Sequence, residues 1–167
     1  MFRKSALLFL LLSAWLRLSA QSVFTVLPLG VKGGLDESNL SAYLVASEGS
    51  SKFICIDAGT VYSGLTVARK KGSIHKTEAS FLKENIKGYF ISHGHLDHVA
   101  GLILNSPEDS KKLIYALPEV LDVFKSNYFT RNAWANFGSD GEAPILNKYR
   151  YVPLVPKIEI AAEGTDL

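Results

Sequence analysis

The sequence predicts a mixed α/β or α+β layered fold, and three observations lead to this prediction. Runs rich in β-branched and aromatic residues alternate with stretches whose apolar residues recur at helical spacing. The first predicted strands follow one another directly, which favours a layered sheet over a regular series of βαβ units. The chain has 167 residues, 47% hydrophobic and 20% charged, which suits one domain with a substantial core. These proportions exclude a disordered, collagen-like or coiled-coil chain.

Three strands are expected early in the chain, over residues 23–29, 40–46 and 52–57. The third strand ends in Asp57-Ala-Gly-Thr60, a combination of residues that suits a tight turn. It also contains Cys55, the only cysteine, so no intrachain disulfide can form. We interpret Cys55 as a buried, inert residue, with a nucleophile as the alternative.

In the middle of the chain, apolar residues at helical spacing predict a helix over residues 77–87, with Gly88 where the helix would stop. A short strand over 89–92 then runs straight into His93, and residues 99–104 have the pattern of a helix packed on a core.

The last third predicts a strand at 113–116 and a helix over 118–125 that begins with a proline. Residues 149–155 and 157–162 are expected to be late strands. Between them, the aromatic residues of 127–137 are interpreted as a loop that covers the core, with a substrate-facing wall as the alternative.

The N-terminus has the pattern of a secretory signal peptide over residues 1–20, which leaves 21–167 as the expected domain. Arg3 and Lys4 precede the apolar run 6–16, which is too short to span a bilayer. We therefore expect a periplasmic or secreted protein without a membrane anchor after cleavage; an uncleaved anchor is the alternative. Removing Arg3, Lys4 and Arg17 lowers the net charge from +2 to −1, so charge gives no support for nucleic-acid binding.

Three of the four histidines lie within six residues, in His93-Gly-His95-Leu-Asp97-His98. Residues i and i+2 of an extended segment point to the same side, so His93 and His95 can hold one ion together. Asp97 and His98 follow where a helix should begin and can face a second ion. We therefore predict His93, His95, Asp97 and His98 as metal ligands, and Asp97 also as the candidate catalytic residue.

Imidazole and carboxylate groups suit Zn²⁺, Mn²⁺ or Fe²⁺, with two divalent ions, taken as Zn²⁺, as the expected cofactors. An accidental polar loop and a purely structural metal site are the alternatives. Structural zinc sites are closed and rich in cysteine, whereas this motif contains none, which favours an open, catalytic site.

H-x-H-x-D-H after a strand resembles the hallmark of the metallo-β-lactamase superfamily, whose fold has four αββα layers. The longer string from His93 to Pro107 resembles the signature of class II 3′,5′-cyclic-nucleotide phosphodiesterases within that superfamily. Further similarity lies in residues 37–44, 55–60, 114–115 and 127–129 and covers nearly all of the chain after residue 20.

The resemblance implies that a metal-bridging hydroxide hydrolyses cyclic AMP, or cyclic GMP, to the 5′-nucleoside monophosphate. A cyclic nucleotide is then the expected small-molecule partner. It also implies that Asp57 holds the metal ligands in their orientation without binding the metal itself. The alternative is that Asp57 caps the turn, and the two roles are compatible.

No histidine follows His98, whereas the resemblance implies a later histidine, a bridging aspartate and a last histidine. We therefore expect the N-terminal half of such a fold, truncated at its C-terminus, with the second ion in doubt and little activity alone. Another hydrolase of the superfamily and a non-catalytic metal-binding remnant are the alternatives.

Overall fold

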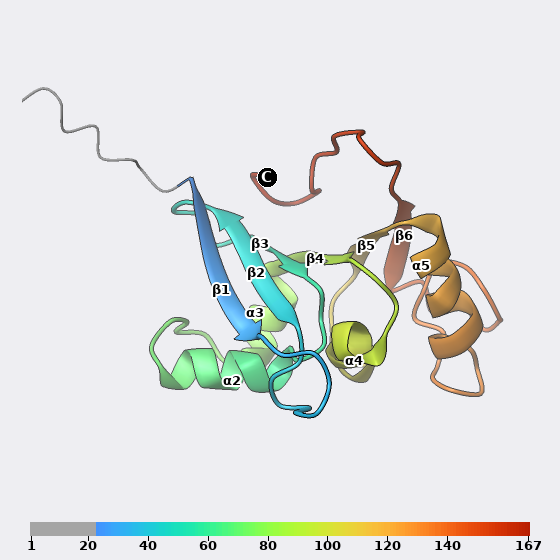
Figure 1. Ribbon diagram of the computed structural model, residues 1–167, viewed down its shortest axis with the longest axis horizontal. Helices are drawn as coiled ribbons and strands as arrows, with labels where there is room; N and C mark the ends of the chain where they lie inside the picture. Colours follow the sequence, from blue (N-terminus) through green and yellow to red (C-terminus); the bar gives the residue numbers. More distant parts are fainter. Residues whose placement is uncertain (1–22) are drawn as a thin grey trace, which may run out of the picture.

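The computed structural model describes residues 23–167, which form one six-stranded mixed sheet with the strands in chain order (Figure 1). The first two pairings are antiparallel and the remaining three are parallel. The strands are β1 (Phe24–Gly30), β2 (Ala42–Ser47), β3 (Phe53–Ile56), β4 (Ile86–Ile91), β5 (Lys112–Ala116) and β6 (Tyr149–Pro153).

Helices occupy the crossovers that parallel pairing requires. In Figure 1, α2, α3 and α4 lie on one side of the sheet, and α5 lies beside β6. A π-helix, η1, continues α5. The helical bounds are α2 (Tyr62–Lys70), α3 (Glu78–Glu84), α4 (Leu96–Asn105), α5 (Pro118–Val123) and η1 (Phe124–Tyr128). The predicted α/β fold class is confirmed.

The core lies between the sheet and these helices. On β2, the side chains of Ala42, Leu44 and Ala46 are fully buried, whereas those between them are half-buried, so one face of the strand carries the core. Cys55 is fully buried as predicted, and burial raises the pKa of its thiol.

The other face of the sheet is apolar and carries no helix (Figure 1). Ile56 and Phe90 are among its exposed side chains, and the C-terminal segment crosses it: the Ser47 hydroxyl donates to the Asp166 carbonyl at 2.8 Å. One sheet with one helical layer is half of the αββα arrangement that the resemblance implies.

The structure differs from the sequence prediction in three places: one helix ends early, one helix was not predicted, and one predicted strand does not form. The helix expected over 77–87 ends at Glu84, because Ile86 pairs with Phe53 and begins β4. The helix α2 (Tyr62–Lys70) was not predicted. Residues 157–162 form no strand. Lys157 there adopts a left-handed φ of 68°, which interrupts an extended run.

The predicted leader, residues 1–20, lies outside the described residues. Among residues 23–167, no helix is both long enough and apolar enough to cross a lipid bilayer.

Candidate metal centre

The histidine motif lies at the junction of β4 and α4. Ile91, 1% exposed, ends β4 inside the core, and Val99 and Leu102 bury the inner face of α4. The intervening loop carries His93 and His95, with His95 as the N-cap residue of α4. Buried apolar residues on both sides therefore fix the ends of the segment that carries the polar ones.

Three of the four predicted ligands converge. One potential ligand atom from each of His93, Asp97 and His98 lies within 4.8 Å of the other two. The His93 and His98 ring centroids are 3.8 Å apart, and His98 Nε2 lies 3.5 Å from Asp97 Oδ2. The side chains of Asp97 and His98 are 27% and 17% exposed, so solvent reaches the cluster.

His95 lies beside this cluster but outside it. Its ring centroid is 4.9 Å from that of His93, with the two rings nearly perpendicular. The structure thus groups His93 with Asp97 and His98, rather than forming the separate His93–His95 and Asp97–His98 pairs predicted from the sequence.

Asp57 lies behind the cluster, at the end of β3, and its side chain is 8% exposed. Its Oδ2 accepts hydrogen bonds from His98 Nδ1 at 2.7 Å and from the Ser92 hydroxyl at 2.9 Å. Its Oδ1 accepts from the Ser92 backbone N–H at 2.9 Å. One buried carboxylate therefore holds both the strand end and the helix start.

These contacts also determine which ring nitrogens are free. A carboxylate can only accept, so a neutral His98 imidazole carries its proton on Nδ1 and leaves Nε2 as a lone pair. Because the Ser92 hydroxyl donates to Asp57, it can accept from His93 Nδ1, 3.1 Å away, which leaves His93 Nε2 unprotonated. Both imidazoles then offer a nitrogen lone pair, as metal ligation requires.

The turn after Asp57 is bonded to the ligand-bearing helix. Ala58 N–H donates to the His98 carbonyl at 2.7 Å, and Gly101 N–H donates to the Gly59 carbonyl at 2.9 Å. A Cβ on Gly59 would lie 2.0 Å from the Asp97 carbonyl oxygen, so only glycine permits this approach. The Asp-Ala-Gly-Thr turn is thus part of the site's framework.

Two contributing residues were not predicted from the sequence. Ser92 was assigned only to the strand before the motif. Tyr128 was quoted only as part of an aromatic segment, yet its hydroxyl donates to the Gly94 carbonyl at 2.6 Å. Burial, and then the charge of Asp97, raise the pKa of Tyr128. Nothing in the sequence pattern links residues 34 positions apart.

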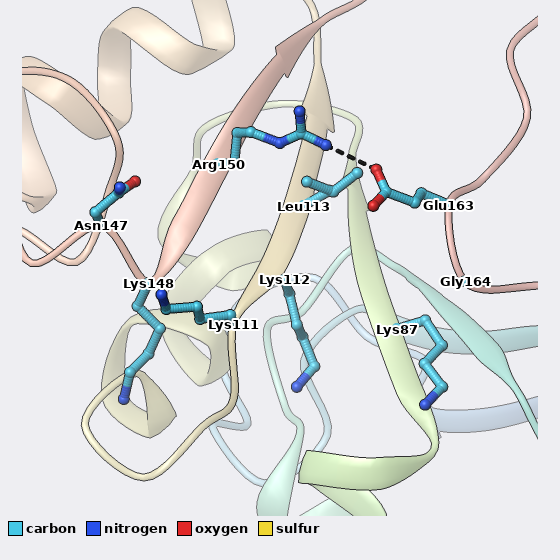
Figure 2. A pocket seen from close by; sticks show the side chains of 9 residues that line it. All are labelled: Lys87, Lys111, Lys112, Leu113, Asn147, Lys148, Arg150, Glu163 and Gly164. Atoms are coloured by element: carbon cyan, nitrogen blue, oxygen red, sulfur yellow. Dashed lines mark hydrogen bonds and ion pairs between the residues drawn. The ribbon is translucent and has the colours of Figure 1, made fainter.

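A separate basic pocket of about 480 Å³ lies at the opposite end of the parallel strands, where β4, β5 and β6 begin (Figure 2). Several of its charged groups are already paired: Lys112 pairs with Asp109, and Arg150 pairs at 2.7 Å with Glu163, which also lines the pocket. Lys148 donates to two backbone carbonyl groups. In Figure 2 the lysine amines do not converge on one point.

The chain is similar to proteins of one known family. Residues 23–160 match the family model of class-II cAMP phosphodiesterases. The chain is 48% identical to a 3′,5′-cyclic-nucleotide phosphodiesterase of Aliivibrio fischeri, over 93% of this chain and 50% of that protein. The chain spans about half the length, or less, of the first curated relatives it matches.

Two solved structures share the fold. The crystal structure of unliganded yeast PDE1 aligns with a TM-score of 0.64 at 21% identity, covering 81% of this chain and 52% of the other. The metallo-β-lactamase fold protein YhfI from Bacillus subtilis aligns at 0.51 and 18% identity, covering 83% and 48%.

Proposed function

The chain belongs to the class-II cAMP phosphodiesterase family, and from this membership we propose that it hydrolyses 3′,5′-cyclic AMP to 5′-AMP, with cyclic GMP as a further substrate. The observation that carries the proposal is the convergence of His93, Asp97 and His98 within the matched residues. The relatives are longer, and of these 167 residues by themselves we expect little activity.

The donor set fits a divalent first-row metal, and we propose Zn²⁺. Two imidazole nitrogens and a carboxylate oxygen, with no thiolate, are the ligands of open, catalytic zinc sites. His93, Asp97 and His98 account for one ion, and a second ion would draw on His95 and further donors. A bound divalent cation would neutralise charge on the phosphoryl oxygens and polarise the phosphodiester.

The chain's own residues prepare this site. The reaction adds water across the P–O3′ bond: the water oxygen bonds to phosphorus, P–O3′ breaks, and the 3′ oxygen gains a proton. Asp57 orients the two imidazoles through His98 Nδ1 and Ser92. Asp97, the candidate catalytic residue, brings a negative charge to the part of the cluster that solvent reaches.

The test is hydrolysis of cyclic AMP by the metal-loaded chain, followed by ³¹P NMR, beside a His98→Ala variant. His75 lies outside the motif and is exposed, so His75→Ala is the matched control. We expect slow formation of 5′-AMP by the parent chain and the control, and none above background by His98→Ala, because that substitution removes a ligand. A chain that binds metal yet leaves cyclic AMP intact would support the metal-binding remnant instead.

We also propose that residues 1–20 direct export and are removed, leaving a domain from residue 21. The support is the order of charged, apolar and small residues in the sequence. N-terminal sequencing of the protein from a periplasmic extract should begin near Gln21. A chain that still carries Phe2 or Arg3 would contradict export with cleavage.

A further inference from the structure

We propose that Tyr128 and Val123, at the two ends of one short helical segment, position the metal-binding loop by holding Gly94 between them. Gly94 is the residue between His93 and His95, so its placement sets how these two ligands are presented. The inference rests on the proposed metal-binding function and adds positioning residues that lie outside the motif.

The first contact is polar. The Tyr128 hydroxyl donates to the Gly94 carbonyl oxygen at 2.6 Å, a short bond across 34 positions of sequence. Tyr128 ends the π-helix η1, in which Phe129 N–H donates to the Phe124 carbonyl at 2.8 Å, an i to i+5 bond. The wider π turn moves Tyr128 out of α-helical register, and such turns recur at functional sites.

The second contact is steric. A Cβ built on Gly94 would lie 2.8 Å from Val123 Cγ1 and 3.0 Å from Val123 Cβ. Val123 therefore lies directly against the α-carbon of Gly94, and any side chain at position 94 would displace the loop or the end of α5. The two contacts restrain the backbone of one residue from one supporting segment.

That segment is itself fixed in the core. Phe124 and Phe129 are fully buried, with ring centroids 5.7 Å apart, and the Tyr128 ring lies 5.9 Å from Phe124. A buried aromatic group beneath Tyr128 limits the positions of its hydroxyl. Tyr128, which is half-buried, thus connects the loop to the core and restricts the motion of the loop.

Tyr128→Phe tests the polar contact, and the chain offers a matched control. The Tyr151 ring also packs on Phe124, with centroids 6.4 Å apart, but its buried hydroxyl has no hydrogen-bond partner. Both substitutions remove one hydroxyl from the same aromatic cluster. We expect Tyr128→Phe to weaken Zn²⁺ binding about 3- to 10-fold, the range of one neutral hydrogen bond, and Tyr151→Phe to leave it unchanged.

Zn²⁺ affinity is measured by competition with a chromophoric chelator, with the thermal midpoint of each variant as the measure of stability. Deuterium uptake by the peptide spanning residues 92–98, in the metal-free chain, is the second readout. We expect faster uptake there in Tyr128→Phe alone. If both variants bind Zn²⁺ and exchange like the parent, the positioning role is wrong.

Gly94→Ala tests the steric contact. We expect it to accelerate exchange over residues 92–98 and to weaken Zn²⁺ binding, and Val123→Ala in the same chain to restore both by making room for the new methyl group. Failure of the second substitution to restore either readout would contradict the contact. If the parent chain binds no Zn²⁺, the proposed function fails, while deuterium uptake still decides whether Tyr128 and Val123 order the loop.

Discussion

Asp57 shows how one residue can connect a strand, a turn and a helix. It adopts a left-handed φ of 54°, which aspartate tolerates better than most side chains. In this conformation its Oδ2 accepts from His98 Nδ1 and from the Ser92 hydroxyl, and its Oδ1 accepts from the Ser92 backbone N–H. The backbone conformation of Asp57 and the orientation of the His98 ring are thus linked.

We predict that Asp57→Asn weakens Zn²⁺ binding about 10- to 100-fold, the range for partners behind metal ligands. The amide keeps the size of the carboxylate but offers one acceptor atom in place of two. It therefore cannot accept from His98 and the Ser92 hydroxyl at one atom and from the Ser92 backbone N–H at the other. Affinity is measured by chelator competition. Asp122→Asn, whose parent side chain is 67% exposed, is the control, and equal affinities in the two variants would contradict the prediction.

The sequence places His93 and His95 on one side of an extended segment by spacing alone, which is the basis for predicting them as metal ligands. It could not predict that His98 would lie against His93, because this depends on the angle between β4 and α4. The contact of Tyr128 with Gly94 could not be predicted from the sequence for a similar reason. It depends on a π turn, for which the sequence has no recognised pattern.

Most strands could be predicted from the composition of their own residues. The ends of helices and strands, in contrast, depended on pairing with residues distant in the sequence. Ile86 continues the apolar spacing of α3, with Phe81 and Leu82, so the pattern extended the helix through it. In the structure Ile86 pairs with Phe53 instead, because the edge of β3 offers backbone partners. Local propensity is weak beside such pairing.

The start of α3 carries a charge that makes its stability depend on pH. Glu78 occupies the first turn, and its Oε1 accepts from Arg69 Nε at 2.9 Å. Its own backbone N–H first, and then Arg69, hold the pKa of Glu78 below its usual 4.5. A carboxylate with a lowered pKa stabilises the fold above its unfolded pKa and ceases to do so as the pH falls through its folded pKa.

We therefore predict that Glu78→Gln lowers the urea midpoint at pH 7, and that the difference from the parent chain shrinks as the pH falls below 4.5 and through the folded-state pKa of Glu78. Glu119→Gln is the control, because Glu119 also occupies the first turn of a helix and is exposed. A difference for Glu78→Gln that persists unchanged at low pH would show that the carboxylate charge is not its cause.

For the whole molecule, a buried polar cluster joins the parallel half of the sheet. Asp109 Oδ2 accepts from the hydroxyl groups of Tyr89 on β4 at 2.7 Å and Tyr149 on β6 at 2.9 Å. Its Oδ1 pairs with Lys112 at the start of β5, where both side chains are at most 1% exposed. One carboxylate from the loop after α4 thus meets three successive strands.

We predict that Asp109→Ala lowers the free energy of unfolding by about 3–5 kcal/mol, because it leaves a buried ammonium and two buried hydroxyl groups without their partner. Urea denaturation at neutral pH measures the change. Asp122→Ala removes an exposed partner of Lys125 and should cost about 0–1 kcal/mol. Asp109→Asn keeps an acceptor for the tyrosines but loses the charge, so its stability should lie between the two. If Asp109→Ala were no less stable than Asp122→Ala, the three strands would be held together by apolar packing alone.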